Sequence, residues 1–231
     1  MSVVVPGEYD PLLITPRWLR EKDLIGAEDY DSYGIEIISS GGTVVSFGSI
    51  VLRVLPDTLQ VSTDAPDDAE AVRDLAAGIL LSMPRDTAGI SAMGINRAVH
   101  FAVPQDAYHT VGDTLVPKGI WDGVLYLAGM VNVGLNGVRE DGYDGGINVQ
   151  VQPSNVVRPG VYVSINDHYT LTHTEVPTDR NFPVDPELLN PQRSADKLQV
   201  AVKILTDDFA TSRNRAQAII DRVASFRSQA G

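Results

Sequence analysis

The stretch GIEIISSGGTVVSFGSIVLRVLPDTLQVST, residues 34–63, holds the pattern that decides the fold. Runs rich in Ile, Val and Leu are separated by tight-turn signals, among them Gly41–Gly42, and this predicts short strands joined by hairpins. In SIVLRVL, Ile50, Leu52 and Val54 share one face because side chains alternate along a strand. Consecutive hairpins of this kind predict an antiparallel sheet.

Two long amphipathic helices are predicted outside this stretch. The first covers residues 66–83, with acidic side chains in its first turn, where they suit the helix dipole. The second runs from Asp207 to about Ser228, with Thr206 as its N-cap. The expected buried stripes are Val72, Leu75, Ala76, Ile79, Leu80 and Met83 in the first helix, and Phe209, Ala216, Ile220, Val223 and Phe226 in the second.

The remaining segments have weaker signals. A short helix is expected at residues 15–24, with a Pro at its first position, and a long strand at 88–103. A further helix is expected at 118–128, and Asn136–Gly137 suits the turn of a hairpin. KLQVAVKIL, residues 197–205, alternates with period two and favours a strand, with a helix as the open alternative.

These elements predict an α+β fold, mostly antiparallel sheets packed by two long helices. The pattern D-x-L-Q-V occurs at Asp57 and again at Asp196, each time ahead of an amphipathic helix. This similarity suggests an internal duplication into two similar halves related by a pseudo-twofold axis. The expected division is an extended N-terminal segment with a short helix at 1–34, a first half at 35–103 and a second half at 104–231.

Composition narrows the class of protein. Apolar residues make up 43% of the chain and charged residues 21%, which is typical of a globular protein. The chain has no cysteine, so disulfides, thiolate catalysis and cysteine-ligated metals are excluded. No apolar run is long enough to span a membrane and no signal peptide is recognised, so we expect a cytoplasmic protein without membrane contact.

Charge is distributed unevenly along the chain. The net charge of −12 argues against binding to the phosphate backbone of nucleic acids. Residues 1–36 contain eight acidic side chains, whereas the last predicted helix contains the basic residues Arg213, Arg215, Arg222 and Arg227. Two solvated faces would explain this, and so would attraction between the two ends, within one chain or between copies. The sharper expectation is a homo-oligomer in which the acidic segment of one copy docks on the basic helix of another.

The run RPGVYVSINDHYTLTHTEVP, residues 158–177, contains the only dense group of Asp, His and Glu near a predicted strand. Asp167 falls in the apolar row of that strand, which predicts a turn or bulge at Asn166–Asp167. His168 and His173 point to opposite faces of a regular strand, so their spacing does not suit a metal ion. We therefore expect no metal site and no cofactor.

A polar pocket on a sheet face is the alternative reading of these residues. Its candidate catalytic side chains are His100, Asp167 and His168, and its candidate ligand-binding side chains are Asn96 and Arg97. No nucleophile, phosphate-loop or calcium-loop motif accompanies them. These five residues consequently remain candidates without an assigned reaction.

Three functions are compatible with these patterns. The leading one is a non-enzymatic protein-interaction or assembly module that binds itself or another protein, favoured by the uneven charge, the long strands and the lack of a catalytic motif. An alternative is a small enzyme or ligand-binding protein with a polar pocket on a sheet face. A further alternative is an acidic inhibitor that mimics nucleic acid.

Overall fold

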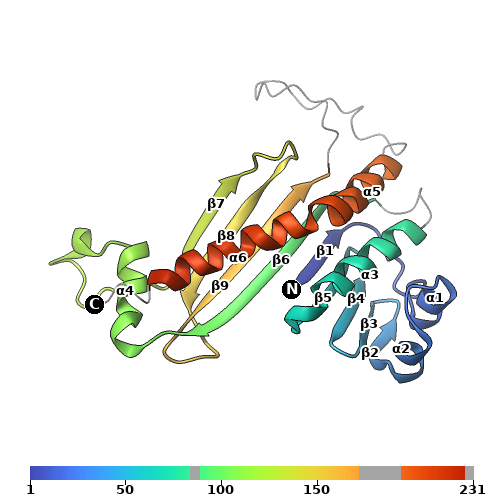
Figure 1. The fold of residues 1–231 in the computed structure, drawn as a ribbon, viewed down its shortest axis with the longest axis horizontal. Coiled ribbons are helices and arrows are strands. Elements are labelled where there is room, and N and C mark those ends of the chain that lie inside the picture. The colour runs from blue at the N-terminus through green and yellow to red at the C-terminus, as the bar shows by residue number, and fades with distance from the viewer. Residues whose placement is uncertain (84–88, 172–193, 227–231) are drawn as a thin grey trace. The chain divides into compact units, whose positions relative to one another are not determined.

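The computed structural model describes residues 1–83, 89–171 and 194–226. Within this part of the chain, hydrogen bonding orders nine strands as β2-β3-β4-β5-β1-β6-β9-β8-β7, and the two longest helices are α3 and α6 (Figure 1). The recorded strand pairs are antiparallel. The expected α+β class, with antiparallel strands and two long helices, is confirmed.

The elements have the following bounds. The strands are β1 (Ser2–Pro6), β2 (Gly34–Ser39), β3 (Gly42–Phe47), β4 (Ile50–Leu55), β5 (Thr58–Thr63), β6 (Ala92–Ala102), β7 (Val133–Val138), β8 (Gly145–Pro153) and β9 (Gly160–Thr170). The α-helices are α1 (Pro16–Glu21), α2 (Ala27–Ser32), α3 (Ala69–Ser82), α4 (Gln105–Leu115), α5 (Ser194–Lys203) and α6 (Phe209–Ser225). Short 3-10 turns are η1 (Pro66–Asp68) and η2 (Gly119–Trp121), and a π-helical turn, η5 (Ile204–Asp208), joins α5 to α6.

The chain forms two compact units, and neither is a continuous segment. Unit 1 consists of Met1–Ile95, Arg139–Gly145 and His168–Ala210. Unit 2 consists of Asn96–Val138, Gly146–Asp167 and Thr211–Gly231. Each unit has its own hydrophobic core.

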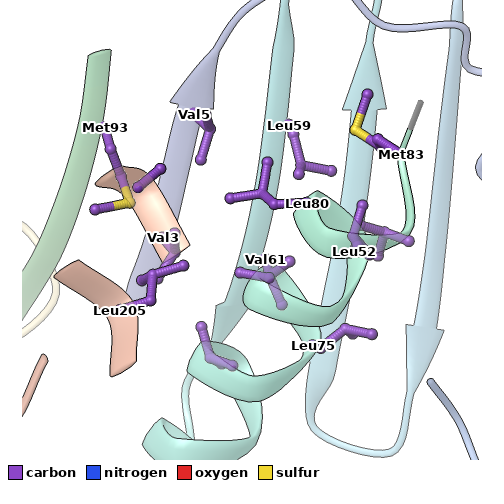
Figure 2. Close-up of a cluster of buried hydrophobic side chains, with 14 of the residues drawn as sticks. Val3, Val5, Leu52, Leu59, Val61, Leu75, Leu80, Met83, Met93 and Leu205 are labelled. Carbon is purple, nitrogen blue, oxygen red and sulfur yellow. The ribbon is translucent and has the colours of Figure 1, made fainter. Parts of the chain in front are cut away.

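In unit 1, α3 packs on one face of the sheet, against β5 and β1 (Figure 1). Leu52, Leu59 and Val61 project from the sheet toward Leu75 and Leu80 of the helix (Figure 2). Complete burial of one such side chain stabilises the folded state by about 1.5–3 kcal/mol. The expected stripe of α3 is confirmed because Val72, Leu75, Ala76, Ile79, Leu80 and Met83 are all buried.

Strand β1 is an unforeseen part of this sheet. An extended N-terminal segment was expected, whereas Ser2–Pro6 pairs with β5 in the register Val3↔Val61. Val3 and Val5 are buried in the core of unit 1. The expected short helix follows as α1, whose N-cap Thr15 accepts a hydrogen bond from the backbone of Trp18.

In unit 2, the buried stripe of α6 packs on the strands β9 and β8. Ala216, Ile220 and Val223 of the helix share a core with Val151, Val161, Val163 and Ile165 of the strands. Phe209, at the beginning of the helix, is buried in the core of unit 1. These four buried positions of the last helix confirm the stripe expected from its spacing.

Residues 197–205 form a helix, so the expected strand is wrong. The same residues that alternate with period two also place Leu198, Ala201 and Leu205 at helical spacing, and these three are buried. Thr206 is not an N-cap, because its hydroxyl donates to the carbonyl of Val202 inside the continuous helix from α5 to α6. The second D-x-L-Q-V therefore lies in a helix, whereas the first lies at β5.

The helix expected at 118–128 is wrong as well. Only the single turn η2 forms there, and the real helix, α4, lies at Gln105–Leu115. The apolar stripe that suggested a packed helix is exposed, with Val124 and Leu125 more than half accessible. A stripe of this kind has no core to pack against and does not hold a helix together.

Two expected turns are absent from the strands that the structure describes. Asn136 and Gly137 lie within β7 and pair with Asn148 and Ile147 of β8. Strand β9 continues through Asn166–Asp167 with strict alternation of buried and partly exposed residues. The chain turns instead at residues 139–144, between β7 and β8.

Candidate functional site

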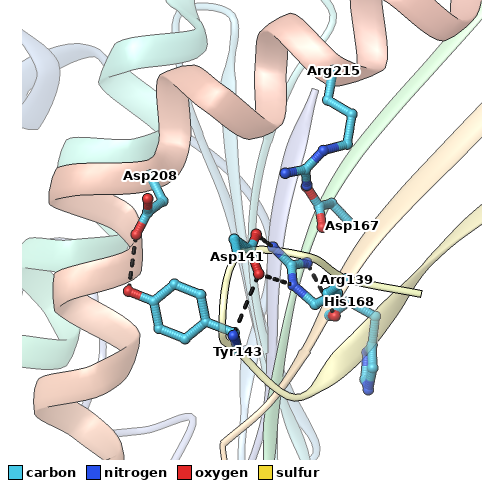
Figure 3. Close-up of polar contacts among 7 residues, drawn as sticks. All are labelled: Arg139, Asp141, Tyr143, Asp167, His168, Asp208 and Arg215. Atoms are coloured by element: carbon cyan, nitrogen blue, oxygen red, sulfur yellow. Dashed lines mark hydrogen bonds and ion pairs between the residues drawn. The ribbon is translucent and has the colours of Figure 1, made fainter. Parts of the chain in front are cut away.

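Asp167 lies in the apolar row of β9, between Ile165 and Tyr169, with 1% of its surface exposed. Its carboxylate accepts a hydrogen bond from Nη1 of Arg215 on α6 at 2.7 Å (Figure 3). A buried carboxylate is strongly unfavourable without a cation and is tolerated with one. Asp167 therefore remains in the regular strand, where it pairs with Arg215, and the turn expected at this position does not form.

The three candidate catalytic residues do not converge. His100 on β6 has its Nδ1 2.9 Å from the hydroxyl of Ser154, and its ring lies against Tyr162 of β9. Asp167 is five residues beyond Tyr162 along the strand, a separation of about 16 Å. His168 follows Asp167 directly, so its side chain alternates to the other face of β9.

The two candidate ligand-binding residues also lie on opposite faces of β6. The guanidinium of Arg97 donates to the amide oxygen of Gln217 on α6, and Gln217 in turn donates to Asp221 at 2.7 Å. Burial lowers the pKa of Arg97, and the charge of Arg213 lowers it further. Asn96, on the other face, accepts a hydrogen bond from the amide of Asn166.

The four basic residues expected at an interface have different environments. Arg215 forms the ion pair with Asp167 inside unit 2, and Arg213 lies close enough to Arg97 to act on its pKa. Arg222 is exposed on α6. Arg227 lies outside the described residues, as does His173.

A second polar cluster fixes the turn between β7 and β8 in unit 1. Arg139 is 8% exposed, forms a two-pronged ion pair with Asp141, and stacks over the ring of Tyr169 at 3.6 Å (Figure 3). Tyr143 donates its hydroxyl to Asp208 at 2.9 Å. Burial raises the pKa of Tyr143, and the hydrogen bond to Asp208 raises it further. These contacts hold the turn in place, and the sequence analysis did not single out any of them.

A row of asparagine amides crosses the face of the unit 2 strands opposite α6. Asn136 donates to Asn148 at 2.7 Å, Asn148 donates to Asn166 at 3.2 Å, and Asn166 donates to Asn96. The row thus passes from β7 through β8 and β9 to β6. Only Asn96 was predicted to take part in binding, because the other three become neighbours only when the strand register is known.

An open hollow of about 460 Å³ lies along this row. It is lined by Asn132, Gly134, Leu135, Asn136, Asn148, Val149, Gln150, Ser164 and Asn166. Every one of these residues is formally uncharged, in a chain whose net charge is −12. The hollow therefore presents hydrogen-bond donors and acceptors without a fixed charge.

The most exposed apolar part of unit 2 is the segment 119–131, which we call the apolar tip. Six of its side chains are more than half exposed: Ile120, Val124, Leu125, Tyr126, Leu127 and Val131. Tyr126 is 93% exposed and Leu127 82%. Solvation of so many large apolar groups in one short segment is typical of a surface that binds something.

The ends of the apolar tip are tied to unit 2. Lys118, just before it, forms an ion pair with Asp113 of α4, and Met130, near its end, packs on the unit 2 core. Leu127 has φ +53°, a left-handed conformation that is unfavourable for leucine. The segment is thus attached to unit 2 near both ends, and the apolar side chains between these ends are exposed.

Strands β2 and β7 end the strand order, so each offers an open edge. Ile35, Ile37 and Ile38 are exposed on β2, which carries a register shift between Ile35 and Ile37. Leu135 and Val138 are exposed on β7. Exposed apolar edges of this kind are the usual sites of strand pairing between chains, and a bulge weakens them.

No described helix is both long and apolar enough to cross a membrane. Among the residues that the structure describes, no group of three or more His, Asp or Glu is arranged to hold a metal ion. No family model, curated protein or solved structure matches the chain.

Proposed function

We propose that this chain is a non-enzymatic assembly module that associates with copies of itself. The apolar tip is the observation that carries the proposal. Burial of one large apolar side chain contributes about 1.5–3 kcal/mol, so burial of these six would supply a large favourable contribution to association. In a monomer these six side chains would stay exposed to water.

Charge complementarity supports a second copy as the partner. The eight acidic residues of the first 36 positions are all exposed, namely Glu8, Asp10, Glu21, Asp23, Glu28, Asp29, Asp31 and Glu36. Arg222 is exposed on α6. Contact between these groups of two copies would orient the association, while the apolar tip would supply most of its free energy.

Light scattering coupled to size-exclusion chromatography tests the proposal. The wild-type chain is expected to elute with the mass of a defined oligomer, and Leu127→Asn is expected to elute as a monomer. Asparagine removes the apolar side chain and tolerates the left-handed conformation at this position, so the variant should fold. Leu81→Asn is the matched control, because Leu81 is also a largely exposed leucine (69%, against 82% for Leu127) and lies on α3 of unit 1.

A wild-type chain that remains monomeric up to high protein concentration contradicts the proposal. Equal effects of Leu127→Asn and Leu81→Asn would also contradict it, because the apolar tip would then have no special role. Deletion of the N-terminal segment is not a suitable test, since β1 belongs to the sheet of unit 1.

The internal duplication remains part of this proposal. Strands β2 to β5 precede the long helix α3, and strands β7 to β9 precede the long helix α6, an order that supports two related halves. The D-x-L-Q-V similarity no longer supports it, because its two copies lie in a strand and in a helix.

A further inference from the structure

The uncharged hollow of unit 2 is distinct from the apolar tip in its chemistry. It lies on the face of β6, β9, β8 and β7 that α6 does not cover, and its central feature is the row Asn136, Asn148, Asn166 and Asn96. We propose that this hollow binds a neutral oligosaccharide.

The amide row matches the hydrogen-bonding pattern of a sugar. A carboxamide offers two N–H donors and an oxygen acceptor, as a hydroxyl group is both donor and acceptor. Each hydrogen bond along the row uses one N–H of an amide and one lone pair of the next oxygen. Asn136 and Asn148 are exposed residues, so both are accessible to a ligand from solvent.

The residues beside the row make room for a ligand. The register that pairs Asn136 with Asn148 pairs Gly134 with Gln150, two residues further along each strand. Gly134 has no side chain and Ser164 a small one, and both line the hollow. The volume of about 460 Å³ lies in the range of sites that hold small ligands.

An aromatic pair lies further along the same face. Tyr162 of β9 points to the same side of the strand as Ser164 and Asn166. The centroid of its ring lies 4.6 Å from that of the His100 ring on β6. A tyrosine combines an apolar ring with a polar hydroxyl, which suits the mixed C–H and O–H surface of a sugar ring. The amide row is thus complementary to the hydroxyl groups of a pyranose, and the aromatic pair is complementary to its C–H surface.

Charge argues against nucleic acids and acidic ligands in the hollow, and strand pairing argues against a peptide. A nucleic acid would require Lys or Arg to neutralise phosphates, and none lines the hollow. An acidic ligand would also meet the net charge of −12 without a local cation. A peptide strand would pair with the edge of β7, outside the face itself.

An array of neutral oligosaccharides, with heparin oligosaccharides as the anionic probes, tests the proposal on the full chain. We expect binding to at least one neutral oligosaccharide and none to heparin. Asn148→Ala should weaken that binding about tenfold or more, because it removes the central amide, which contacts two neighbours. Asn214→Ala is the matched control, since Asn214 is an exposed asparagine on α6.

Nuclear magnetic resonance of the wild-type chain provides a readout that does not depend on any variant. The side-chain NH₂ signals of Asn136, Asn148 and Gln150 should shift when the bound oligosaccharide is added. Absence of binding to every neutral oligosaccharide on the array overturns the proposal. Equal binding by Asn148→Ala and the wild type, or shifts confined to other residues, overturns it as well. Leu127→Asn should bind as the wild type does, which separates this site from self-association.

Discussion

Asp167 of β9 and Arg215 of α6 form a 2.7 Å ion pair in which the carboxylate is 1% exposed and the guanidinium side chain 26% exposed. The two residues are 48 positions apart in the sequence. They connect the long helix to the strand through a polar contact beside the apolar core of unit 2.

Removal of the cation alone should be strongly destabilising. Arg215→Met removes a cation that donates a hydrogen bond to the buried carboxylate of Asp167, and we expect the free energy of unfolding to fall by about 3–5 kcal/mol. The double variant Asp167→Val with Arg215→Met should recover most of this loss, because no charge is then buried. Urea denaturation measures both.

Arg222→Met is the control for the ion pair, since Arg222 is exposed on the same helix. It should change the stability by no more than about 0.5 kcal/mol. A double variant as unstable as Arg215→Met would show that the pair does not act as a unit.

The glycine at the start of β8 is required by its backbone. Gly145 has φ +128°, and a Cβ atom there would lie 2.1 Å from the carbonyl oxygen of His168. Gly145→Ala should therefore lower the stability by about 2 kcal/mol or more. Gly134→Ala, on neighbouring β7, has no atom within 4 Å of its Cβ and should be neutral or slightly stabilising. Thermal unfolding of the two variants gives the comparison, and similar midpoints would refute it.

Tyr9 should make stability depend on alkaline pH. Its hydroxyl donates to the carbonyl of Val5 at 3.0 Å, and burial raises its pKa well above the usual value of 10.0. An acid whose pKa is raised by folding stabilises the protein fully below the unfolded pKa, and this stabilisation is lost as the pH rises toward the folded pKa. Unfolding measured between about pH 9 and 11 should thus show a decline above about pH 10.

Tyr9→Phe should reduce that decline and should lower the stability at neutral pH by about 1 kcal/mol, because a buried hydrogen bond is lost. Tyr126→Phe is the matched control, since Tyr126 is 93% exposed. Identical pH profiles for wild type and Tyr9→Phe would show that the buried phenol is not responsible.

Association of copies should depend on salt through α6. Arg222→Glu replaces an exposed cation by an anion and should weaken the oligomer at low salt, where charges on separate copies attract most strongly. The difference from wild type should shrink above about 0.5 M NaCl, because the screening length is then only a few ångströms. Sedimentation velocity at low and high salt measures the effect. An Arg222→Glu oligomer of unchanged affinity at low salt would contradict the charge contact.

The fold was predictable where local patterns had one interpretation. Residues 34–63 consist of runs rich in Ile, Val and Leu with turn residues between them, so β2 to β5 followed directly. Residues 197–205 satisfy both a period of two and helical spacing, and only the packing of Leu198, Ala201 and Leu205 decides between them. The N-terminal strand was missed because its pairing with β5 is not local.

The candidate site was less predictable because its parts meet through strand register. Asn136, Asn148 and Asn166 are unremarkable one by one, and a shift of a single residue in any strand would separate them. The sequence analysis also assigned Arg215 to an outer surface, because nothing local connects it to Asp167. A buried carboxylate in an apolar row was the available signal that a distant cation had to exist.

Each unit is built from three separate segments of the chain, and this limits how the protein can be divided. The chain passes from one unit to the other at residues 95–96, 138–139, 145–146, 167–168 and 210–211. No single cut yields a fragment that consists of one whole unit and nothing of the other, so neither unit can be produced or exchanged as one continuous segment.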